Sequence, residues 1–171
     1  MIKNFVEVGT IVGTHGLNGE LRVQPWADSP DELKKYKKFY LKESETDVAV
    51  VSSCRIHGNI VILKLKDIDN IDNAIKFKNR TLYVKRSDIK LQKGHYLIDE
   101  IKGCKVFGDA EESVFYGVIS DVTTFGSRND VWHIKNDDKE YLFPAVKSMI
   151  ISVEPEKERV IINPIKGIFD D

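Results

Sequence analysis

Three glycines near the start of the chain could belong to a phosphate-binding loop. Gly13, Gly16 and Gly19 follow a G-x-x-G-x-x-G spacing. Both the dinucleotide fingerprint and the P-loop have a different spacing between their glycines, and the P-loop also ends in Gly-Lys-Ser/Thr. The segment therefore matches neither motif. Glycines that flank a strand more often supply positive φ angles for a tight connection. We therefore interpret this segment as a turn.

The residues that do catalytic or metal chemistry are scattered along the chain. The run Asp67, Asp69, Asp72 lacks the glycine of a calcium loop and instead suits a helix start, where acidic groups complement the dipole. Two cysteines, Cys54 and Cys104, are too few for a disulfide framework or a thiolate zinc site. No two histidines have the i, i+4 spacing of a helical metal pair. They are His15, His57, His95 and His133. The sequence predicts no metal, no cofactor and no catalytic residue, which favours a binding protein over an enzyme.

A cluster of lysines is a candidate for binding phosphate. Ser29-Pro30-Asp31-Glu32 has the capping residues of a helix start. In the expected helix, one side holds Leu33, Tyr36 and Tyr40 and the opposite side holds Lys34, Lys35 and Lys38. The helix is expected to fray before Tyr40, since residues 39–41 suit a strand equally well. These lysines either contact nucleic-acid phosphates or form a solvated face.

Aromatic side chains in turn-like segments of the second half are candidates for a protein interface. They are Tyr96, Phe125 and Trp132. An exposed aromatic residue is a typical anchor of a protein interface, although each of these three, taken alone, more often belongs to a core.

Most of the remaining chain predicts strands, because apolar and polar residues alternate with a period of two. We expect strands at 6–12, 20–25, 48–56, 60–65, 80–84, 104–107, 114–122, 131–134, 141–143, 150–153 and 159–162. His57-Gly58-Asn59 predicts a hairpin turn. A second short helix is expected around an apolar stripe of Ile68, Ile71, Ala74 and Ile75.

This pattern indicates an all-β protein of two small β-barrel domains, with one or two short helices in the first. The polar segment 86–93 is the expected linker, which places the domains at 1–85 and 94–171. The chain has 171 residues, 42% of them hydrophobic, which is enough for two small cores.

The charge of the chain is unevenly divided. Its net charge of -1 excludes a histone-like polycation. Residues 1–90 hold 16 Lys and Arg against 12 Asp and Glu, a balance of +4, whereas residues 91–171 hold 10 against 15, a balance of -5. Either the halves face different partners or these charges are simply solvated. No stretch suits a membrane span or a secretory signal, so we expect a cytoplasmic protein. We also expect it to be a monomer.

Six motifs in order resemble the RimM family of bacterial ribosome maturation factors. The segment 8–23 is similar to the family's opening strand and H-G-x-x-G-E turn, and 74–84 to the end of its first domain. The later motifs are Tyr96 to Val106, Tyr116-Gly117-Val118-Ile119 with Gly126 to Val131, Leu142 to Val146, and Asn163 to Ile168. The family's adjacent tyrosines are Tyr96-Leu97 here, which leaves Tyr96 alone at that place.

The resemblance implies a translation-protein-like first barrel and a PRC-barrel, and a non-catalytic factor that binds the immature 30S small ribosomal subunit. It implies maturation of the subunit head, processing of 16S rRNA, and direct binding of the nineteenth small-subunit ribosomal protein. The residues expected to bind that protein are Tyr96, Phe125, Arg128, Asn129, Asp130 and Trp132. The residues expected to face RNA or the ribosome are His15, Gly16, Gly19, Glu20, Arg22, Lys34, Lys35 and Lys38.

Two other functions remain open from the sequence. Barrels of the first kind also occur in flavin reductases, so a flavin- or small-molecule-binding enzyme is the main alternative. The other is a free-standing scaffold built on the PRC-barrel.

Overall fold

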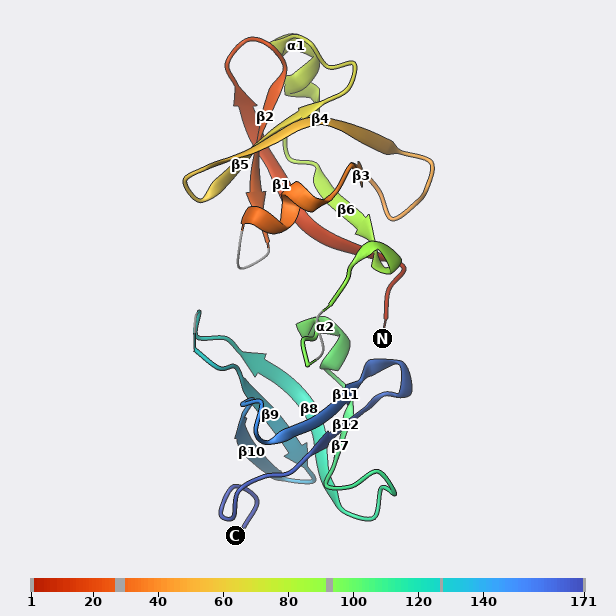
Figure 1. The fold of residues 1–171 in the computed structure, drawn as a ribbon, viewed down its shortest axis with the longest axis vertical. Coiled ribbons are helices and arrows are strands. Elements are labelled where there is room, and N and C mark those ends of the chain that lie inside the picture. Colours follow the sequence, from red (N-terminus) through yellow and green to blue (C-terminus); the bar gives the residue numbers. More distant parts are fainter. Residues whose placement is uncertain (1, 27–29, 92–93, 127, 171) are drawn as a thin grey trace. The chain divides into compact units, whose positions relative to one another are not determined.

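The computed structural model describes residues 2–26, 30–91, 94–126 and 128–170 (Figure 1). The chain divides into two compact units, one formed by residues 3–90 and the other by residues from 91 onward together with Ile2, so the division after the first barrel lies between Lys90 and Leu91. This division falls inside the segment 86–93, although Ile89 still packs against the first core. The linker and domain boundaries therefore stay a prediction.

The first unit is a closed barrel with the strand order β1-β2-β5-β4-β3-β6. Its strands are β1 (Phe5–His15), β2 (Glu20–Pro25), β3 (Lys38–Tyr40), β4 (Val48–His57), β5 (Ile60–Leu65) and β6 (Thr81–Lys85). The helical segments are η1 (Pro30–Lys35), α1 (Ile71–Ala74), η2 (Ile75–Phe77) and η3 (Arg86–Asp88). Along β2 and β5, the alternating apolar residues are buried, as the period of two in these segments predicts: Leu21, Val23, Pro25, Val61, Leu63 and Leu65. Gly58 has a φ of 62° in the predicted hairpin between β4 and β5.

The lysine-bearing helix is shorter than predicted. Only a 3-10 helix, η1, forms, and Tyr40 and Lys38 lie on β3. Residues 38–40 pair with β4 instead of continuing the helix. In this strand Phe39 lies opposite Ala49 and is fully buried. The prediction of one helical face carrying Lys34, Lys35 and Lys38 is therefore wrong. The capping residue Ser29 lies outside the described residues.

The second predicted helix forms as α1 followed by η2. Asn70 caps α1, because its side chain accepts a hydrogen bond from the Asn73 backbone at 2.9 Å. Ile68 and Ala74 are buried as expected, but Ile75 is 57% exposed. The α-helix ends at Ala74, and Ile75 begins the 3-10 turn η2. Because a 3-10 turn has three residues per turn, Ile75 does not continue the apolar stripe of the α-helix.

The second unit is a six-stranded sheet with the order β10-β9-β8-β7-β12-β11. Its elements are α2 (Ile98–Ile101), β7 (Lys105–Phe107), β8 (Phe115–Thr123), β9 (Val131–Asn136), β10 (Lys139–Pro144), β11 (Ile150–Glu154), η4 (Pro155–Lys157) and β12 (Arg159–Ile162). Only β12 and β7 run parallel among these pairs. Phe143 of β10 and Val153 of β11 pack against the same core, so the two edge strands enclose one interior. The sequence did not predict α2.

Candidate functional site

In the second unit, three of the predicted interface residues form one hydrogen-bonded group. The Tyr96 hydroxyl donates to Asp130 Oδ2 at 2.9 Å and accepts from Trp132 Nε1 at 3.1 Å. The rings of Tyr96 and Trp132 meet edge to face, with centroids 5.5 Å apart. Burial, and then the hydrogen bond to Asp130, raise the pKa of the Tyr96 phenol well above its usual value. The phenol therefore stays protonated and donates to the carboxylate.

Trp132 differs from the expectation that it anchors a protein interface directly. Its side chain is fully buried on β9, in the core that also holds Ile134 and Phe143. It cannot touch a partner without unfolding the strand. Its sequence position beside a turn was misleading because the strand register, which pairs Trp132 with Phe143, turns it inward. Its contribution is to hold Tyr96.

The loop between β8 and β9 carries the exposed members of the predicted set. Phe125 is 52% exposed, and Arg128 and Asn129 are exposed beside it. The Arg128 backbone N–H donates to the Phe125 carbonyl at 3.3 Å, and Ala145 donates to the Asp130 carbonyl at 2.8 Å. The loop is thus fastened at Asp130 by both a backbone bond to the segment after β10 and a side-chain bond to Tyr96.

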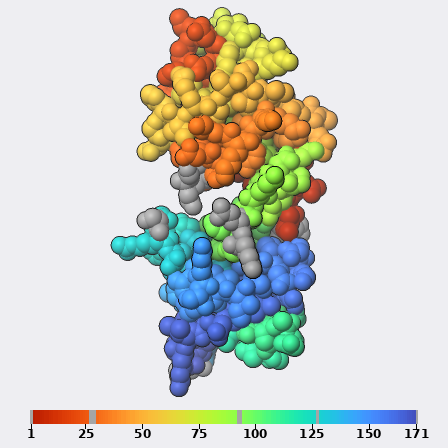
Figure 2. All heavy atoms as spheres, in the orientation of Figure 1, coloured from red at the N-terminus to blue at the C-terminus, as the bar shows by residue number. Residues whose placement is uncertain are grey.

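In the first unit, the β1–β2 turn that holds Gly16 and Gly19 is tightly fixed. The two glycines have φ of 65° and 90°. A Cβ on Gly19 would collide with the carbonyl of Ile68. Lys64 Nζ bonds to the Asn18 carbonyl at 2.6 Å, to the Ile68 carbonyl and to Asp69 at 3.2 Å. The glycines therefore serve a rigid surface turn, which lies beside α1 in Figures 1 and 2.

His15, Glu20 and Arg22 adjoin two residues that the sequence did not single out as a site. Arg55 makes a two-pronged ion pair with Glu20, at 2.9 and 3.4 Å. The rings of His15 and His57 are 5.9 Å apart. Arg55 and His57 lie on β4, far along the chain from β1, and no local pattern signals that the barrel brings them here.

The three predicted lysines do not form a common patch. Lys35 is paired with Glu32 at 2.8 Å, which raises the pKa of the Lys35 ammonium through that hydrogen bond. Lys38 Nζ lies 5.8 Å from the centre of the Tyr40 ring. Lys34 is exposed on η1.

Neither unit shows a metal cluster within the described parts of the chain, where no three His, Cys, Asp or Glu side chains come together. Across those same ranges, no helix is long and apolar enough to cross a bilayer.

Known proteins match this chain along nearly its whole length. A family model described as the RimM N-terminal domain matches residues 6–89. A protein named ribosome maturation factor RimM from Clostridioides difficile is 37% identical over 96% of this chain and 95% of its own length. One of the same name from Geobacillus kaustophilus is 33% identical over 99% of this chain and 98% of its own.

Two solved structures are also similar. One, of a 16S ribosomal RNA processing protein RimM from Pseudomonas aeruginosa, is 27% identical, with 94% of this chain and 97% of that chain covered and a TM-score of 0.48. The other, of the N-terminal domain of RimM from Thermus thermophilus, is 17% identical, covers 51% of this chain and 95% of its own, and has a TM-score of 0.43.

Proposed function

The chain belongs to the RimM family of ribosome maturation factors, and from that membership we propose that it is a non-catalytic assembly factor for the small ribosomal subunit. It binds the immature 30S particle, promotes maturation of its head and supports processing of 16S rRNA. It acts as a monomer in the cytoplasm. The two curated relatives carry the name of a maturation factor and match this chain from end to end, which supports the assignment.

The second unit binds the nineteenth small-subunit ribosomal protein. The observation that carries this step is the exposure of Phe125 and Arg128 in a segment whose end at Asp130 is bonded to Tyr96, which is in turn bonded to the buried Trp132. A segment fastened at one end loses less conformational entropy on binding, and an aromatic residue with an arginine near it is a typical anchor pair. The balance of -5 over residues 91–171 also favours a basic partner.

The first unit contacts the ribosomal RNA. Its balance of +4 over residues 1–90 favours phosphate, and its surface carries Lys34 and Arg22 in exposed positions. Opposite charge on the two units would let one small chain engage RNA and a basic protein together.

Sedimentation of the full chain with ribosomal particles tests the assignment. We expect the chain to travel with free small-subunit precursors and to be absent from mature ribosomes. A Phe125→Ala, Arg128→Ala double variant should lose binding to the purified ribosomal protein. Leu142→Ala is the matched control, since Leu142 is 58% exposed on β10, outside the loop.

Several outcomes would contradict the proposal. If the wild-type chain does not associate with small-subunit precursors, the assembly role is wrong. If Leu142→Ala weakens protein binding as much as the loop variant, the loop is not the contact. A change in the flavin absorption spectrum when flavin is titrated into the protein would instead support the enzyme alternative.

A further inference from the structure

The outer face of the first barrel has two arginines on either side of a buried isoleucine. Ile62 of β5 pairs with Arg22 of β2 on one side and with Arg55 of β4 on the other. Its neighbours Val61 and Leu63 belong to the barrel core, so alternation along the strand turns Ile62 outward. Ile62 is nevertheless only 1% exposed. We attribute this burial to the aliphatic stems of the flanking arginines, which leave their guanidinium groups at the surface.

One of these guanidinium groups is held in place and the other is available. Arg55 donates hydrogen bonds to both carboxylate oxygens of Glu20, and 53% of the Arg55 side chain is still exposed. A guanidinium has five N–H donors, so Arg55 keeps donors for a further ligand. Arg22 is exposed and makes no hydrogen bond or ion pair with any residue in the described ranges.

Two imidazoles lie next to this pair. His15 ends β1 and His57 ends β4, and their rings are 5.9 Å apart at a tilt of 51°. Within the described chain, neither ring makes a hydrogen bond, so both present nitrogen atoms to a ligand. The strand register places Glu20, Arg22 and Arg55 on the same side of the sheet as these imidazoles. The ammonium of Lys64 is bonded to the turn carbonyls and to Asp69.

We propose that His15, Arg22, Arg55 and His57, hereafter the His–Arg face, bind the phosphate backbone of ribosomal RNA. The proposal rests on the assembly function above and specifies where the first unit touches RNA. Arginine forks suit the paired oxygens of a phosphate, and the ring N–H of an imidazole adds a further donor. The carboxylate of Glu20 is ion-paired with Arg55 on this face and orients its guanidinium.

The His–Arg face suits phosphate better than the lysines that the sequence singled out. Lys35 is paired with Glu32 and Lys38 lies against the Tyr40 ring, whereas Arg22 has no such contact. The four residues of the face lie on strands of a closed barrel, so the positions of their backbone atoms are fixed before a ligand binds. The Arg55 guanidinium, which Glu20 already holds, loses less entropy on binding than the side chain of Lys34, which is exposed on η1.

The test measures binding of the full chain to a transcript of the head region of 16S rRNA by filter retention at several salt concentrations. An Arg22→Gln, His57→Gln double variant should bind more weakly, and the slope of log affinity against log salt should become shallower by about 1 for each lost phosphate contact. Lys42→Gln is the matched control, because Lys42 is an exposed lysine of the same unit that lies between β3 and β4, outside the face. Circular dichroism verifies that both variants are folded.

The outcomes separate this inference from the assembly function. If the wild type sediments with small-subunit precursors but the Arg22→Gln, His57→Gln variant binds the transcript with unchanged affinity and slope, only the His–Arg face is wrong. Failure of the wild type to sediment with the precursors overturns the assembly function itself. If polyglutamate competes for the face as well as RNA does at equal charge, the face recognises acidic protein and the inference is wrong.

Discussion

The hydroxyl of Tyr96 joins Asp130 to Trp132, since it donates to the carboxylate at 2.9 Å and accepts from the indole at 3.1 Å. Tyr96 precedes α2 and Asp130 precedes β9, so one oxygen ties together segments that are distant in the sequence. The bond fixes the end of the exposed β8–β9 loop to the core. In this way the core of the second unit determines the position of a surface that we assign to protein binding.

Tyr96→Phe should destabilise the second unit by about 1–3 kcal/mol, because it leaves the buried Trp132 indole N–H without an acceptor. Urea unfolding followed by Trp132 fluorescence measures this, in a Trp26→Phe background that removes the signal of the exposed Trp26.

Tyr116→Phe is the control for this substitution. Tyr116 stacks on Phe169 with ring centroids 4.2 Å apart, and its hydroxyl bonds to no residue that the structure describes. The change should alter the free energy of unfolding by less than about 0.5 kcal/mol. Equal losses in the two variants would show that the aromatic rings, rather than the Tyr96 hydroxyl, carry the effect.

Gly19→Ala should destabilise the first unit by about 2–5 kcal/mol. Its φ of 90° is unfavourable for a residue with a side chain, and the new Cβ would collide with the Ile68 backbone. At Gly16 a new Cβ would meet no atom within 4 Å, so Gly16→Ala should cost only the strain of placing a side chain at its φ of 65°, about 1–2 kcal/mol. Thermal unfolding of both variants checks the difference. If the two substitutions cost the same, the close approach to Ile68 has no energetic consequence.

The sequence was sufficient for the strands, the division into all-β units and the family, because these depend on local alternation and ordered motifs. Val61, Leu63 and Leu65 show this, since each is 1% exposed as their spacing predicts. Residues that meet only through barrel closure could not be found in that way. Glu20 and Arg55 are 35 positions apart, and nothing local links them. Trp132 and Ile75 were misjudged for a related reason, because strand register and helix tightening decide which way they point.

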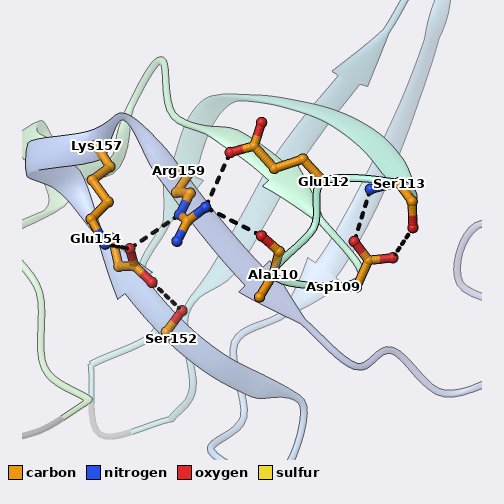
Figure 3. Close-up of polar contacts among 8 residues, drawn as sticks. All are labelled: Asp109, Ala110, Glu112, Ser113, Ser152, Glu154, Lys157 and Arg159. Carbon is orange, nitrogen blue, oxygen red and sulfur yellow. Dashed lines mark hydrogen bonds and ion pairs between the residues drawn. The ribbon is translucent and has the colours of Figure 1, made fainter.

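Arg159→Lys should loosen the loop between β7 and β8. Arg159 donates to Glu154 at 3.1 Å, to Glu112 at 3.1 Å and to the Ala110 carbonyl, and so joins β11, β12 and the loop (Figure 3). A lysine has a single ammonium on a flexible stem and cannot hold all three. Hydrogen exchange of a peptide covering 108–114 should therefore become faster.

Lys157→Gln is the matched control for that experiment. It removes only the 2.8 Å pair between Glu154 and a lysine that is 59% exposed, and exposed pairs contribute little. If Lys157→Gln speeds exchange in the loop as much as Arg159→Lys does, the branched contacts of Arg159 do not order the loop.

Glu154 should make the second unit sensitive to acid. Hydrogen bonds from Lys157, Arg159 and Ser152 lower the pKa of the Glu154 carboxyl from 4.5 to about 2 (Figure 3). Between these two values the unfolded chain binds a proton that the folded chain does not, so stability rises with pH across that window. The stabilising contribution is complete above about pH 5 and is lost as the pH falls through about 2. Glu154→Gln should therefore lower the urea midpoint at pH 7, and its deficit relative to wild type should shrink steadily between pH 5 and pH 2.

Glu156→Gln is the control, since exposed Glu156 forms no ion pair within the described ranges, and it should leave the midpoint unchanged at both ends of the series. A deficit for Glu154→Gln that stays constant across the series would show that the neutral amide loses packing or hydrogen bonds, and that the charge of Glu154 contributes nothing.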